Sequence, residues 1–206
     1  MVYCARAKSA SFFDFILYIY RFFFSKIPNY IYTRISKIRF THRQVITIKG
    51  TSLKIVVDPK NGTTDTELFL KKERDMDVVN LMKKYCTPGS TFIDIGANIG
   101  YETLWGASLV GPSGAVYAFE PIPRLVSQIK ESISHNIFSN ITIVPKACGG
   151  KEAVSTIYFH EEDAGLTSLA NNTGSTQKTT VQVTTLDTEL ENVGHVSMIK
   201  VDVEGY

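Results

Sequence analysis

Apolar and polar residues follow two different periods along the chain, and the change falls near residue 43. In residues 11–25, SFFDFILYIYRFFFS, the polar residues recur every three or four positions and form one narrow stripe on an otherwise apolar helix. After Pro28, residues 29–40 place three isoleucines on one helix face and basic residues elsewhere. The pattern predicts an amphipathic helical segment over residues 1–42, separate from a domain over residues 43–206.

The domain is expected to begin with short accessory elements. In residues 43–59, RQVITIKGTSLKIVVDP, alternation on both sides of Lys49-Gly50 predicts a β-hairpin within residues 43–60. A helical period follows over residues 64–84, with Asp65 or Thr66 as its N-cap and a stop at TPGS.

Strands and helices alternate after residue 90. The apolar runs 91–95, 115–119 and 141–144 predict strands, and residues 101–109 and 124–135 predict the helices between them. Such units close into a parallel sheet with right-handed connections. The predicted fold is therefore α/β, a doubly wound, Rossmann-like parallel sheet. A β insert over residues 150–195, with two β-like runs, precedes a fourth core strand that ends in KVDVEG.

Composition narrows the class of protein. A chain of 206 residues with 44% hydrophobic content can bury one sizeable core, and a formal net charge of +2 favours no nucleic-acid partner. Three cysteines without metal-ligand spacing favour a reducing, cytoplasmic compartment. Residues 1–40 differ from the rest, because they hold seven Lys/Arg, one acid and twelve of the 23 aromatic residues.

Residues 11–40 therefore suggest a contact with an apolar or anionic surface. A helix of fifteen residues spans about 22 Å, short of the roughly 30 Å hydrocarbon core, so no transmembrane span is expected. Two alternatives remain open. The segment lies on a membrane surface as a peripheral contact, or it packs against the domain or an oligomeric partner.

The stretch TFIDIGANIGY, residues 91–101, is the centre of the candidate chemistry. Ligands of doubly wound sheets bind at the carboxyl ends of the strands, which places Asp94 and the glycines Gly96 and Gly100 at the site. Glu120 ends the next strand twenty residues after Gly100, where an acid can accept both hydroxyls of a ribose. An adenosine-type cofactor is predicted.

The glycine spacing selects among adenosine cofactors. A dinucleotide fingerprint requires glycines where this chain has Asn98 and Tyr101, so close approach of a pyrophosphate is hindered. A ligand with an amino-acid tail and a positively charged sulfur tolerates Asn98 and is favoured by Asp94. S-adenosylmethionine fits this description, and a nicotinamide dehydrogenase is disfavoured.

Several ordered blocks then carry a family resemblance: TFIDIGANIGYETL, GAVYAFEPIPRL, SHNIFSNITIVPKACGG, TTLDTEL and MIKVDVEGY. Over roughly residues 64–206 the chain resembles the FkbM family of methyltransferases. The resemblance implies a class I methyltransferase fold, S-adenosylmethionine as donor, and a hydroxyl acceptor on a sugar, glycan or natural product. The residues it assigns are Asp94, Gly96, Asn98 and Gly100 for the methionine-side turn, Glu120 and Pro121 for the ribose and adenine edge, Ala147 for the adenine wall, and Asp202 and Glu204 facing the methyl group and the acceptor.

Asp202 and Glu204 are the candidate catalytic residues. Either could remove the proton of an acceptor hydroxyl, and Asp202 could equally bind only the amino group of the cofactor. The run His160 to Asp163 invites a metal site, but consecutive acids on a strand alternate faces, and we expect no metal.

The family pattern continues beyond the fourth core strand, whereas this sequence stops at Tyr206. We therefore expect a fragment or a decayed copy in which residues 1–206 alone aggregate and are inactive. The alternative function is a non-catalytic membrane-surface or interaction protein with a vestigial methyltransferase fold.

Overall fold

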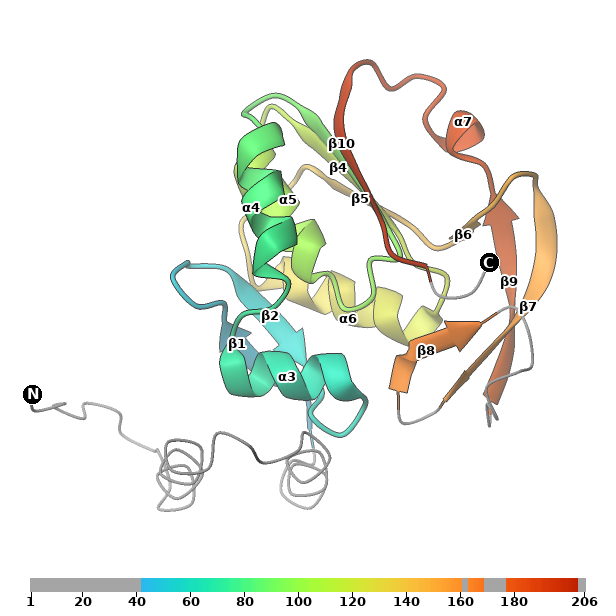
Figure 1. Cartoon of the computed structure of the whole chain (residues 1–206), viewed down its shortest axis with the longest axis horizontal. Helices are drawn as coiled ribbons and strands as arrows, with labels where there is room; N and C mark the ends of the chain where they lie inside the picture. The colour runs from blue at the N-terminus through green and yellow to red at the C-terminus, as the bar shows by residue number, and fades with distance from the viewer. Residues whose placement is uncertain (1–41, 161–162, 169–176, 204–206) are drawn as a thin grey trace, which may run out of the picture.

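The computed structural model describes residues 42–160, 163–168 and 177–203 (Figure 1). The predicted amphipathic segment lies outside these residues except for its last position, and Glu204 lies outside them too. The domain begins with β1 (Gln44–Thr47) and β2 (Lys54–Val57), which pair antiparallel as the alternation predicts. No helix among the described residues is long and apolar enough to cross a membrane.

The single helix predicted over residues 64–84 is wrong, because two helices occupy this region. Helix α3 (Thr63–Lys71) ends where Lys72 adopts a left-handed backbone, and α4 (Met76–Tyr85) begins after Asp75, which is also left-handed. The polar run KKERD between them offers no apolar residue for a continuous helix to bury. Gly62 takes the N-cap position, and Asp65 lies buried inside the first turn of α3, so the predicted caps were also wrong.

The central sheet is parallel and has the strand order β10-β3-β4-β5. Strands β3 (Thr91–Ile95), β4 (Ala115–Phe119) and β5 (Ile141–Val144) have the predicted bounds, and β10 (Val196–Val201) supplies the fourth strand. Helices α5 (Tyr101–Val110) and α6 (Pro123–Ser134) connect the first three strands. The α/β fold with a parallel sheet is thus confirmed.

Alternation along β3 divides the core between the two faces of the sheet. Phe92 packs with α4 and α5, which lie side by side in Figure 1, whereas Ile93 and Ile95 belong to a second cluster with Phe119. Asp94 shares the face of Phe92, toward α5. A side chain at Gly106 of α5 would overlap the Phe92 ring, so this glycine lets the helix approach the strand closely.

Four strands between residues 147 and 184 form a second sheet with the order β6-β9-β7-β8. Its strands are β6 (Ala147–Cys148), β7 (Ala153–His160), β8 (Asp163–Ser168) and β9 (Gln177–Thr184). Two β-like runs were predicted for the β insert, but its described residues form three strands, and the end of the second run, residues 185–190, is not a strand. Thr185 caps the short helix α7 (Leu186–Glu189) by accepting a hydrogen bond from the backbone N–H of Thr188 at 3.1 Å.

Candidate functional site

The connection between β3 and α5 is a tight turn fixed by the neighbouring strand. The backbone N–H groups of Gly96 and Ala97 both donate to the carbonyl of Phe119, each at 3.0 Å. Gly96, Asn98 and Gly100 have φ values of 77°, 51° and 87°, which lie in the left-handed region. Three such residues within five positions turn the chain sharply at the carboxyl end of β3.

Gly96 has no room for a side chain, and Gly100 is tightly packed. A Cβ at Gly96 would overlap the carbonyl oxygen of Asp202, and one at Gly100 would lie 3.1 Å from Cγ1 of Ile129. The backbone N–H of Asp202 donates to the carbonyl of Ile95 at 3.0 Å, which holds the end of β10 against the turn. The predicted turn residues and Asp202 are therefore brought together at one edge of the sheet.

Asp94 and Asp202 stand in opposite environments. Asp94 is fully buried, and its Oδ2 accepts a 2.6 Å hydrogen bond from the hydroxyl of Thr103 while Oδ1 lies 3.1 Å from Nζ of Lys200. The Asp202 side chain is 66% exposed and lies 3.8 Å from the same ammonium. Asp94 is thus held within the structure, whereas Asp202 is open to a partner molecule.

Glu120 joins the turn to the start of α6. Its Oε2 accepts from the backbone N–H of Asn98 and its Oε1 from that of Ile122, both at 2.9 Å. Burial raises the pKa of Glu120 to about 7, although these two backbone N–H groups lower it. A carboxylate has about four acceptor positions, so two backbone bonds leave room for two more.

Comparison with known proteins identifies the family of this chain. The methyltransferase FkbM domain model matches residues 94–206, which is more than half of the chain.

The chain belongs to the FkbM methyltransferase family. Among curated relatives, a protein-L-isoaspartate O-methyltransferase from Methanococcoides burtonii is 31% identical over 85 residues, 39% of this chain and 42% of that protein. An arsenite methyltransferase from Halobacterium salinarum is 32% identical over 54 residues, 26% of this chain and 14% of that protein. This chain therefore spans less than half of the length of the relatives it matches.

A solved structure also aligns with part of the chain. The S-adenosylmethionine-dependent O-methyltransferase from Thermotoga maritima has 17% identity and a TM-score of 0.35, covering 53% of this chain and 43% of that one.

The FkbM domain contains site residues that the sequence did not point out. Lys200 and Thr103 contact Asp94, and Glu102 lies buried in the first turn of α5. Burial, followed by the charge of Asp94, raises the pKa of Glu102 to about 7. A signal for Lys200 was present, because β alternation puts it on the same face of β10 as Asp202, two residues later.

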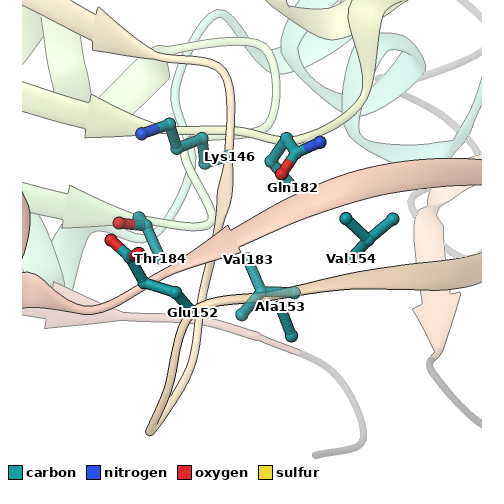
Figure 2. Close-up of a pocket in the computed structure, with 7 residues that line it drawn as sticks. All are labelled: Lys146, Glu152, Ala153, Val154, Gln182, Val183 and Thr184. Carbon is teal, nitrogen blue, oxygen red and sulfur yellow. The ribbon is translucent and has the colours of Figure 1, made fainter.

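The two remaining predicted residues are Pro121, directly after Glu120, and Ala147, at the start of β6. Pro121 and Ala147 are half-buried, and Ala147 pairs with Val183 in the second sheet. A pocket adjoins this end of the FkbM domain (Figure 2). It is lined by Lys146, Glu152, Ala153, Val154, Gln182, Val183 and Thr184. The ammonium of Lys146 is neutralised by Glu189 at 2.5 Å.

Three buried acids in the domain should make its stability depend on pH. Burial raises the pKa values of Asp65, Glu102 and Glu120 to about 7, so the folded protein holds protons that the unfolded chain releases at lower pH. We expect the free energy of unfolding to fall as pH rises from about 4.5 to about 7, by up to about 1.4 kcal/mol per pH unit for each acid. Urea unfolding at several pH values measures this slope.

A variant isolates one of the three acids. Asp65 accepts hydrogen bonds from the backbone N–H of Asp58 and from Gln128 Nε2, through an oxygen that asparagine retains. Asp65→Asn should therefore fold and show a shallower slope than the wild type. Stability that rises with pH across this interval in the wild type would contradict the three raised pKa values.

Proposed function

We propose that the protein transfers a methyl group from S-adenosylmethionine to a hydroxyl oxygen of a small acceptor, such as a sugar, glycan or natural product. The observation that carries this proposal is the Glu120 clamp, in which one carboxylate binds both the Asn98 turn and the start of α6. This arrangement places a carboxylate with free acceptor positions beside a turn that has a side chain where a pyrophosphate binder needs glycine.

The charges of the site favour a cationic ligand. Four acids, Asp94, Glu102, Glu120 and Asp202, lie around the carboxyl ends of β3, β4 and β10, with Lys200 among them. When bound, S-adenosylmethionine supplies a methyl group activated by a positively charged sulfur. An excess of acidic groups over Lys200 attracts such a charge, most strongly above about pH 7, where Glu102 and Glu120 are ionised. We propose that the Glu120 carboxylate accepts the ribose hydroxyls and that the turn at Gly96 receives the amino-acid tail.

Asp202 is the proposed group on the acceptor side. Its carboxylate is the exposed acid next to the turn, so an acceptor can reach it from solvent. A base at this position would take the proton of the acceptor hydroxyl, whereas a carboxylate that binds the cofactor amino group would contribute affinity only. Glu204, the other proposed base, lies outside the described residues. The β insert over residues 150–195, which contributes β7, β8 and β9 to the second sheet, is proposed to shape the acceptor pocket.

Methyl transfer measured with an Asp202→Asn variant tests both parts of this proposal. We expect the full-length protein to move a labelled methyl group onto a hydroxyl acceptor. If Asp202 is the base, the variant should lose kcat by about 10²-fold or more with unchanged cofactor affinity; if it binds the amino group, the loss should appear in the cofactor Kd. Asp77→Asn, which changes an exposed acid in α4, is the matched control. Methyl transfer to protein carboxyl groups or RNA alone would contradict the hydroxyl acceptor.

The role of the N-terminal segment and the cellular location of the protein are predictions from the sequence. Division into residues 1–42 and 43–206, a cytoplasmic location and peripheral membrane contact through residues 11–40 rest on composition alone. Sedimentation of the full-length protein with anionic liposomes tests the contact.

A further inference from the structure

Lys200 reaches from β10 to the turn at the end of β3. Its side chain is 11% exposed, and Nζ donates a 2.9 Å hydrogen bond to the carbonyl of Gly96. The same ammonium lies 3.1 Å from Oδ1 of Asp94, which β pairing places opposite Lys200. One buried cation therefore holds both the carboxylate before the turn and the first carbonyl within it.

The surrounding acids keep this ammonium charged. Burial alone would lower the pKa of Lys200, but the carboxylates of Asp94, Glu102 and Asp202 raise it above its ordinary value. A hydrogen bond donated by a charged group is stronger than a neutral one, and its loss would leave Asp94 buried without its cation.

The hydrogen bond from Lys200 supports the carbonyl side of the turn Gly96–Gly100. Gly96 and Ala97 donate their backbone N–H groups to Phe119, but the Gly96 carbonyl points to β10 and accepts from Lys200. Asn98 is the non-glycine residue of this turn with a left-handed backbone, a conformation that is sparsely populated outside glycine, so the turn needs support from its surroundings. A bond on the carbonyl side fixes the peptide plane that the donor side alone leaves free to tilt.

We propose that Lys200 is a positioning residue that fixes the turn Gly96–Gly100 in the conformation that receives the amino-acid tail of the cofactor. This inference rests on the proposed function, because it assigns the tail to that turn. Glu120 holds the other side of the turn, so the ribose end should depend on Glu120 rather than on Lys200.

Ligands with and without the tail separate positioning from general stability. S-adenosylmethionine and S-adenosylhomocysteine carry the tail, whereas adenosine lacks it. In the full-length protein, Lys200→Met should weaken both tailed ligands at least about tenfold and leave adenosine within about twofold of the wild type. Lys49→Met, which breaks the exposed ion pair to Glu73 in the β1–β2 turn, is the matched control and should change none of them. Equal loss for adenosine would overturn the inference.

A second variant tests the same role of Lys200 if Lys200→Met does not fold. Lys200→Arg keeps a positive charge beside Asp94, but its longer planar group cannot occupy the position of an ammonium in so confined a place. We expect tailed ligands to weaken relative to adenosine again. Wild-type affinity for all three ligands would overturn the inference.

Amide hydrogen exchange makes the outcome independent of any ligand. In either variant, exchange at Ala97, Asn98 and Gly100 should be at least about tenfold faster, while amides of β4 keep their protection. If the wild type binds no adenosine ligand, the proposed function fails. Unchanged exchange at the turn would instead overturn the role of Lys200.

Discussion

Replacing Gly96 with alanine is expected to abolish measurable cofactor binding and to lower the free energy of unfolding by roughly 2–5 kcal/mol. Two costs add at this position. The backbone is left-handed, with φ of 77°, and the new Cβ would overlap the carbonyl oxygen of Asp202. Because Asp202 is bonded through its own N–H to Ile95, the clash must separate β10 from the turn.

Two other glycines serve as matched controls for this variant. Gly50 has nearly the same φ, 74°, but no atom lies within 4 Å of its Cβ position, so Gly50→Ala carries the backbone cost alone. Gly150→Ala carries neither cost, since its Cβ position is open and its φ is ordinary. In urea unfolding, the free energy of unfolding should be much lower for Gly96→Ala than for Gly50→Ala, and lower for Gly50→Ala than for Gly150→Ala. In calorimetry, Gly96→Ala should be the variant that loses cofactor binding. Equal effects at Gly96 and Gly50 would contradict the close contact with Asp202.

Glu120→Gln is expected to weaken S-adenosylmethionine binding about 100-fold while the protein still folds. Glutamine has one acceptor oxygen, whereas Glu120 accepts from both Asn98 and Ile122, so one backbone N–H loses its partner. The charged acceptor proposed for the ribose hydroxyls is lost as well. Glu131→Gln, which removes a partly exposed carboxylate paired with Arg43 at 2.7 Å, is the control and should bind S-adenosylmethionine normally.

The same carboxyl should make cofactor affinity depend on pH. Burial raises the pKa of Glu120 to about 7, and hydroxyl donors favour the ionised form. The affinity of the wild type should therefore fall as pH is lowered below about 7, while Glu120→Gln should show a weaker dependence, because only Glu102 then has a pKa raised to about 7 at the site. Isothermal titration calorimetry on both sides of about pH 7 measures the difference. A wild-type affinity that is flat across this range would contradict a role for the ionised Glu120.

The sequence pattern located the core strands correctly, because a short apolar run between turn residues is typical of a buried strand. The runs 91–95, 115–119 and 141–144 are short, apolar and bounded by turn residues, and their bounds match β3, β4 and β5. The break between α3 and α4 was missed, because left-handed conformations at Lys72 and Asp75 have no glycine to signal them.

The sequence predicted where the backbone turns and strand ends of the site lie, but not which side chains contact one another there. Spacing alone located Gly96, Gly100 and Glu120, since backbone turns and strand ends follow from local sequence. That Asp94 would be buried against Lys200, some hundred residues later in the chain, depends on the pairing of β10 with β3. The same pairing leaves Asp94 buried and Asp202 exposed, and this difference cannot be predicted from the residues next to either acid.

Isothermal titration calorimetry of the full-length protein with S-adenosylmethionine, S-adenosylhomocysteine and a nicotinamide dinucleotide tests the central claim most directly. We expect the first two ligands to bind at one site per chain and the dinucleotide to show no binding, because Asn98 and Tyr101 stand where its pyrophosphate needs glycine. Binding of the dinucleotide, or no binding of either sulfur ligand, would contradict the assignment of this turn to S-adenosylmethionine.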